Sequence, residues 1–152
     1  MYVKYHIIFG LIFAGFFYLI FNIGIVGFFI IFLSSFLIDV DHYIYYAFKK
    51  KSIDLKQAYN YFMKNEEKML SYPRKQRNQI YGGHCILHGV EFVLILFLLS
   101  FFSKYVLYIL LGVAFHLLLD ITYQTTYWDR LDKVSFIWDY LKFKKFKHIE
   151  HI

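Results

Sequence analysis

Residues 24–42 read GIVGFFIIFLSSFLIDVDH, an apolar run that ends abruptly in Asp39, Asp41 and His42. The first 15 residues of this stretch carry no charge. A helix that is apolar on every side is buried either in the core of a large protein or in lipid. The stretch therefore predicts a membrane helix, and it raises the question of why three ionisable side chains follow it directly.

The composition of the whole chain favours lipid over a soluble core. The hydrophobic fraction is 59% of 152 residues, whereas about 45–50% is usual for a soluble domain. A water-soluble chain of this length cannot hide so many large apolar side chains, because its surface is large relative to its volume. The single cysteine, Cys85, excludes an intramolecular disulfide.

Four apolar segments lie at residues 7–21, 24–38, 89–102 and 105–119. Asn22 and Gly24 break the first pair, and Ser103 and Lys104 break the second, as expected of tight turns between helices. We therefore expect an all-α integral membrane protein with four short transmembrane helices in two hairpins. Each segment is shorter than the roughly 20 residues that cross a hydrocarbon core of about 30 Å, so flanking aromatic residues or local thinning of the bilayer must compensate.

We expect residues 1–152 to form a single membrane domain with two polar additions. A basic insert at 48–83 holds nine of the 17 Lys and Arg residues. Within it, residues 54–70 have the spacing of an amphipathic helix, which Pro73 would end. The basic amphipathic tail at 127–152 mixes Trp, Phe and Lys in the manner of a helix lying in the membrane interface.

The charges predict the orientation of the spans. In the four-span arrangement, 16 of the 17 Lys and Arg residues fall on one side, and only Lys104 falls on the other. This asymmetry places the termini and the insert in the cytoplasm and the spans in the cytoplasmic membrane. The net charge of +6 is then explained by attraction to anionic lipid headgroups, so membrane lipid rather than nucleic acid is the expected partner.

In this orientation, nine ionisable residues reach the same membrane face. His84 and His88 are four residues apart, as are His116 and Asp120, so each pair would project from one face of a helix. Imidazole and carboxylate together suit zinc, and sites of mixed nitrogen and oxygen ligands also take manganese or iron. The pattern predicts one or two divalent metal ions, with zinc as the first choice. The nine residues are His6, Asp39, Asp41, His42, His84, His88, Glu91, His116 and Asp120.

Simpler roles fit some of these residues singly. The DVDH stretch would also mark the water boundary at a helix end, and His84 would also suit an ordinary loop. His88 and Glu91 would also form a local hydrogen-bonded pair. His116 and Asp120, however, interrupt an otherwise apolar segment, where ionisable groups are costly. Three separate segments with ligand spacing on one face favour the metal site.

The order of these elements resembles the membrane-bound metal-dependent hydrolases of the YdjM type. That family carries an Asp-x-Asp-His element, an element with two histidines and a His-x-x-x-Asp element between apolar helices. Here LIDVDH, HCILHG and HLLLD follow in the same order, and His84 lies one residue closer to His88 than in the family. The family is distantly similar to zinc-dependent phospholipases C, which implies phosphodiester hydrolysis. The residues carried over are His6, Asp39, Asp41, His42, His88, His116 and Asp120.

We therefore expect a membrane-embedded metal-dependent hydrolase of a phosphoester or lipid-linked substrate at the cytoplasmic interface. The expected general bases are Asp39, Asp41 and Glu91. Two other classes fit the same residues: a transporter that passes protons or metal ions through the cluster, and a non-catalytic membrane scaffold. The transporter predicts polar groups along the whole span, but the distal halves offer only Tyr18, Asn22 and the tyrosines at 105–108. The expected metal ligands are His6, Asp39, Asp41, His42, His84, His88, His116 and Asp120.

Overall fold

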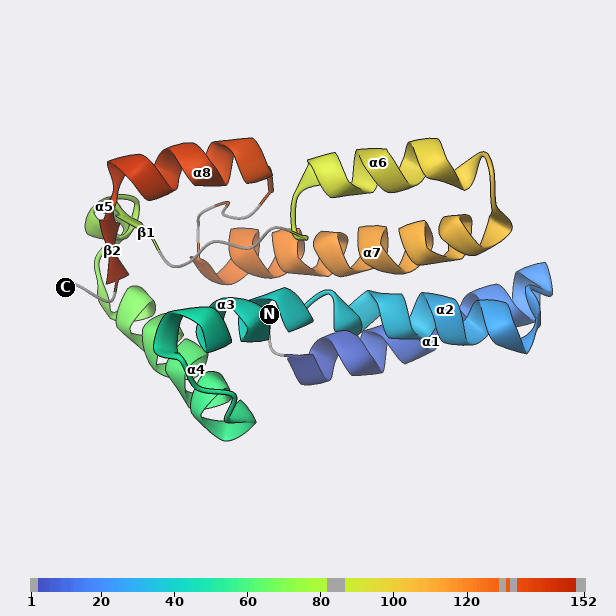
Figure 1. Ribbon diagram of the computed structural model, residues 1–152, viewed down its shortest axis with the longest axis horizontal. Coiled ribbons are helices and arrows are strands. Elements are labelled where there is room, and N and C mark those ends of the chain that lie inside the picture. The colour runs from blue at the N-terminus through green and yellow to red at the C-terminus, as the bar shows by residue number, and fades with distance from the viewer. Residues whose placement is uncertain (1–2, 82–86, 129–130, 132–133, 150–152) are drawn as a thin grey trace.

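The computed structural model describes residues 3–81, 87–128, 131 and 134–149. The chain is mostly helical, with two very short strands (Figure 1). The elements are α1 (Val3–Phe21), α2 (Gly24–Leu37), α3 (Val40–Lys50), α4 (Leu55–Ser71), α5 (Arg74–Arg77), β1 (Ile80–Tyr81), α6 (Val90–Ser100), α7 (Lys104–Tyr123), the π-helix η1 (Gln124–Trp128), α8 (Phe136–Lys145) and β2 (Lys147–His148).

Within the described residues, three helical stretches are long and apolar enough to cross a membrane: Val3–Phe21, Gly24–Lys50 and Lys104–Trp128. The fourth apolar helix, α6, has only 11 residues. Many large apolar side chains on these helices point outward, including Leu19 at 79% exposure. Length, composition and outward-facing apolar surface are together consistent with an integral membrane protein.

The apolar helices form two hairpins, α1–α2 and α6–α7, whose turns lie at the same end of the molecule (Figure 1). Asn22 and Gly24 take positive φ angles of 49° and 71° in the first turn, which suits these two residue types. In the second turn, the side chain of Ser103 accepts a hydrogen bond from Tyr105 N at 3.3 Å and caps α7. Both breaks expected from the sequence are therefore helix turns.

Small residues allow α7 to approach α2 closely. A Cβ added at Gly112 would lie 2.0 Å from Ser34 Oγ and 2.5 Å from the carbonyl oxygen of Ile31. Gly10 on α1 approaches Ser35 on α2 in the same way. Such small-residue contacts bring helix backbones together where lipid supplies no hydrophobic drive for association. They fix the spacing of the helices that carry the ionisable residues.

Two boundaries differ from the sequence expectation. The helix expected at 24–38 does not stop there, because α3 follows α2 after a single turn at Ile38 and Asp39 and runs into the expected insert. His88 lies in the turn before α6 and not on a helix, since Gly89 is the residue that begins the helix as its N-cap. The expected helical pairing of His88 with His84 involves a residue outside those that the structure describes.

The insert and the tail pack together as a cap at the other end of the molecule. The amphipathic helix expected at 54–70 is found as α4, and Asp54 caps it by accepting a hydrogen bond from Gln57 N at 2.9 Å. Strands β1 and β2 pair in parallel, beside a small core of Met69, Ile80 and Ile149. The all-α expectation missed this pairing because two-residue strands have no readable periodicity.

Candidate metal centre

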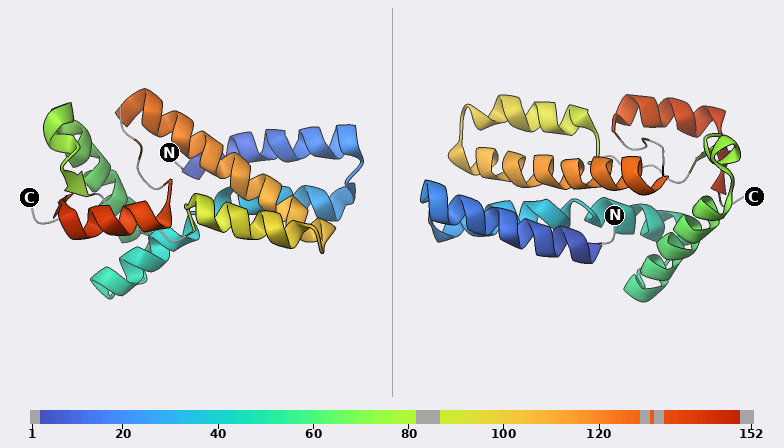
Figure 2. Two further views of the ribbon diagram at one scale, coloured as in Figure 1. Left: turned by 90° about the horizontal axis from the view of Figure 1, so that it is seen from above. Right: turned by 180° about the vertical axis from the view of Figure 1, so that it is seen from behind.

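Seven of the expected site residues come together in one buried group, which we call the His/Asp cluster: His6, Asp39, Asp41, His42, His88, His116 and Asp120. They come from the start of α1, the α2–α3 junction, the turn before α6 and the second half of α7. These segments lie far apart in the sequence but meet where the two hairpins join the cap (Figures 1 and 2). Four of the side chains are 5% exposed or less: His6, His88, His116 and Asp120.

Four atoms form the centre of the cluster. The Nε2 atoms of His88 and His116 lie 3.2 Å apart. Oδ1 of Asp39 lies 3.3 Å from the first and 3.7 Å from the second. Oδ2 of Asp120 lies 3.7 Å from the first and 3.5 Å from the second. The two imidazoles therefore each face a carboxylate oxygen of Asp39 and one of Asp120.

The hydrogen bonds at the opposite ring nitrogens determine where the histidine protons lie. Nδ1 of His116 is 2.9 Å from the carbonyl oxygen of Ser35, which only accepts, so this nitrogen donates. Nδ1 of His88 is 3.0 Å from Oδ2 of Asp41 and donates to that carboxylate in the same way. In the neutral rings, both Nε2 atoms then carry a lone pair and no proton. Two lone pairs and two carboxylates facing one another repel, and either a bound cation or protonation of an imidazole relieves this repulsion.

The distances are compatible with ligand atoms that bind one cation. A tetrahedral ion with bonds of about 2.0–2.1 Å holds its ligand atoms about 3.3 Å apart. The five measured separations among the four central atoms run from 3.2 to 3.7 Å. His88, His116 and Asp120 form one of the ligand groups that the geometry allows, and Asp39, His42 and His88 form another. The coarse prediction of a possible metal site among these residues is confirmed, without an identified metal.

Asp41 orients the cluster through two histidines. Its Oδ1 lies 2.7 Å from Nδ1 of His42, and its Oδ2 accepts from Nδ1 of His88. The backbone N–H of Leu87 also donates to Oδ2, at 3.1 Å. A carboxylate that binds the remote nitrogen of a metal-binding histidine fixes the tautomer and raises the ligand's basicity. The sequence predicted Asp41 as a ligand or base, whereas its contacts are those of a residue that positions ligands.

His6 forms the other side of the cluster. Its ring stacks on that of His116 with centroids 3.9 Å apart, and its Nε2 lies 3.2 Å from Oδ1 of Asp120. The carboxylate accepts, so Nε2 donates and Nδ1 carries a lone pair. Nδ1 of His6 and Oδ2 of Asp39 are buried and have no hydrogen-bond partner among the described residues. Buried acceptors of this kind are expected where an ion or water belongs.

Two of the nine predicted residues are not seen in the cluster. Glu91 instead accepts hydrogen bonds from the hydroxyl of Ser135 at 2.5 Å and from Phe136 N at 2.8 Å, at the start of α8. Its carboxylate therefore fastens α8 to the beginning of α6. His84 lies outside the described residues.

Sequence reasoning missed one contributor. The carbonyl oxygen of Ser35 sets the tautomer of His116, and a backbone atom leaves no signal in the side-chain pattern. Comparison of the chain with family models, curated proteins and solved structures finds no match.

Proposed function

We propose that the chain is a membrane-embedded metal-dependent hydrolase that acts on a phosphoester or lipid-linked substrate at the cytoplasmic interface. The observation that carries this proposal is the meeting of the Nε2 atoms of His88 and His116 with carboxylate oxygens of Asp39 and Asp120, at separations of 3.2–3.7 Å. This donor set costs free energy to bury unless it binds a cation. The resemblance to the YdjM-type hydrolases supports the same chemistry.

Zinc is the proposed metal, because imidazoles and carboxylates are among its usual ligands. Manganese and iron accept the same donors. The proposed ligands of the first ion are Asp39, His88, His116 and Asp120. The free acceptors Nδ1 of His6 and Oδ2 of Asp39 are the proposed ligands of a second ion beside it.

The residues of the cluster divide the catalytic work. When bound, a divalent cation supplies Lewis acidity toward a phosphoryl oxygen and lowers the pKa of water. Nδ1 of His6 accepts a proton in the one-ion form, since its lone pair is buried next to the ligands. Asp120 holds His6 in place through Nε2, and Asp41 holds His42 and His88 through their Nδ1 atoms.

The proposed topology has both hairpins in the bilayer, α6 included, with the cap and the termini in the cytoplasm. Asp39 follows Gly24 by 15 residues, which is about 22 Å of helix. The cluster is therefore about 22 Å from the hairpin turns, and a hydrocarbon core measures about 30 Å. This distance supports a site close to one face of the membrane, where lipid headgroups are within reach.

Metal content tests the proposal. The purified protein in neutral detergent is dialysed against zinc, washed, and analysed for metal per chain, alongside His116→Ala and Asp120→Ala. We expect at least one ion per wild-type chain and loss of that ion in both variants. His148→Ala removes a histidine outside the cluster and should keep the metal. A wild type that folds but holds no zinc, manganese or iron would overturn the proposal.

Hydrolysis is measured on the same samples with phosphodiester and phosphomonoester lipids in mixed micelles. We expect release of product by the metal-loaded wild type and by His148→Ala only. Metal binding without hydrolysis of any phosphoester, together with metal uptake into sealed vesicles, would favour the transporter class instead.

A further inference from the structure

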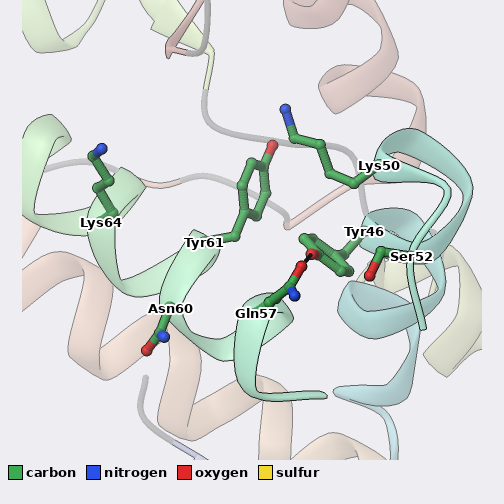
Figure 3. A pocket seen from close by; sticks show the side chains of 7 residues that line it. All are labelled: Tyr46, Lys50, Ser52, Gln57, Asn60, Tyr61 and Lys64. Atoms are coloured by element: carbon green, nitrogen blue, oxygen red, sulfur yellow. Dashed lines mark hydrogen bonds between the residues drawn. The ribbon is translucent and has the colours of Figure 1, made fainter. Parts of the chain in front are cut away.

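Outside the His/Asp cluster, an open cavity of about 390 Å³ lies on the surface between α3 and α4 (Figure 3). Its volume falls within the range of small-ligand sites, about 300–1,000 Å³. Two lysines line it and no carboxylate does, so its charge favours an anion. The lining residues are Tyr46, Lys50, Ser52, Gln57, Asn60, Tyr61 and Lys64.

The walls of this cavity are held in place by their own contacts. The hydroxyl of Tyr46 donates to Oε1 of Gln57 at 3.3 Å, and the rings of Tyr46 and Tyr61 pack with centroids 5.4 Å apart. Nζ of Lys50 lies 5.2 Å from the centroid of the Tyr61 ring, a cation–π distance. Figure 3 shows the amines of Lys50 and Lys64 and the hydroxyl of Tyr61 projecting in the same direction from α3 and α4.

One face of α3 connects the cavity to the cluster. His42, Tyr46 and Lys50 follow one another at intervals of four residues, so they lie along the same side of this helix. His42 packs on Phe62 of α4 with ring centroids 5.5 Å apart, next to the contact between Tyr46 and Tyr61. Lys50 is thus about 12 Å along the helix axis from His42.

The surface around the cavity has the character of a membrane contact. Phe48 and Ile53 are each 82% exposed, and Leu55 is 69% exposed. Lys49, Lys50 and Lys51 lie among them. The beginning of α4 stands out from the side of the bundle, level with the beginning of α1 along the long axis (Figures 1 and 2). Exposed apolar side chains mixed with lysines are typical of segments that enter the headgroup layer.

We propose that this cavity binds the phosphate of an anionic phospholipid headgroup. The two lysines neutralise the phosphate, and Ser52 and Gln57 offer neutral polar groups to the rest of the headgroup. The acyl chains then run past the exposed side chain of Ile53, next to Ser52 in the chain, into the bilayer. The inference rests on the membrane location in the proposed function but not on its metal chemistry.

The test measures binding of short-chain phosphatidylglycerol with a fluorescent tail to the full chain in neutral detergent. It compares the wild type with the double variant Lys50→Gln/Lys64→Gln. The matched control is Lys56→Gln/Lys75→Gln, which removes the same charge from two exposed lysines outside the cavity. We expect the cavity variant to bind about tenfold more weakly or worse, since each lysine near a lipid surface contributes attraction of its own. The control should change binding by less than about twofold.

Competition distinguishes a lipid from a free anion. Inorganic phosphate at millimolar concentration should not displace the labelled phosphatidylglycerol, whereas unlabelled phosphatidylglycerol should. Equal displacement by inorganic phosphate would overturn the assignment of a lipid ligand. Equal weakening of binding in both double variants would overturn the site, because only the net charge of the protein would then matter. Metal content is measured on every sample. Normal metal in the cavity variant separates failure of this site from failure of the metal centre.

Discussion

The two ends of α7 illustrate two different ways of burying a helix. Toward the hairpin turn, α7 buries Leu110 and Val113 against Leu96 and Ile38. One turn later it buries His116, and after another turn Asp120, at 0% and 5% exposure. The first half is stabilised by fit between apolar and small residues. The second half buries polar side chains, whose hydrogen-bonding groups need specific partners.

The difference indicates that the apolar half serves as the frame for the polar half. Packing between apolar side chains tolerates small shifts, because each contact is weak and undirected. A metal site does not, since ligand atoms must stay within a few tenths of an ångström of their required distances. The close approaches at Gly10 and Gly112 therefore matter beyond their own packing, because they set the spacing of α1, α2 and α7 at the cluster.

Damage to the frame should have the largest effect. In Gly112→Ala, the new Cβ meets the carbonyl oxygen of Ile31, a backbone atom that cannot rotate away, so α7 must move from α2. We expect a loss of unfolding free energy of about 2–3 kcal/mol and a loss of bound metal. Both are measured in the same detergent, by denaturant titration and by elemental analysis.

Gly15→Ala is the matched control, because a Cβ at this position meets nothing within 4 Å. It should leave metal content unchanged and stabilise α1 by up to about 1 kcal/mol through helix propensity. Destabilisation without metal loss in Gly112→Ala would show that the cluster holds its geometry independently of the frame, and the comparison of the two halves would break.

A change inside the polar half should act on the metal alone. In the wild type, His42 and His88 each donate an N–H to one carboxylate oxygen of Asp41. In Asp41→Asn, one of these oxygens becomes an NH₂ group, so one of the two histidines loses its acceptor. We expect metal affinity to fall by about 10- to 100-fold, while the unfolding transition of the metal-free protein changes little. Competition with a zinc-binding dye measures the affinity.

Asp54→Asn provides the control for this substitution, since Asp54 caps α4 away from the cluster and Asn caps nearly as well. Its metal affinity should equal that of the wild type. An Asp41→Asn variant with unchanged affinity would show that Asp41 does not position the histidines.

Much of the fold could be predicted from the sequence, because apolar runs and the residues that break them are strong local signals. The turn at Asn22 and Gly24, the amphipathic α4 and the convergence of seven site residues were all readable from spacing. The positioning role of Asp41 was not readable, because Asp39 and Asp41 both look like ligands in the sequence DVDH although their side chains make different contacts. The pairing of β1 with β2 depends on residues 67 positions apart in the chain, and no local signal records that distance.

Glu91 yields the smallest expected effect, and it tests the one predicted base that lies outside the cluster. Its carboxylate accepts hydrogen bonds from Ser135 and Phe136 at the positive end of the α8 dipole. Glu91→Gln keeps one acceptor oxygen but removes the charge, so α8 should loosen by about 1 kcal/mol. Hydrogen exchange of the α8 amides, about fivefold faster than in the wild type, would report this change.

Metal content and hydrolysis should stay at wild-type levels in Glu91→Gln, as in the control Glu67→Gln on the exposed surface of α4. The opposite result is equally informative. If hydrolysis falls while α8 exchange and metal content stay unchanged, Glu91 acts in the reaction itself, as its position one turn from His88 first indicated. The distinction between contacts that anchor the cap and residues that react in the cluster would then be wrong, because the Glu91 carboxylate would do both.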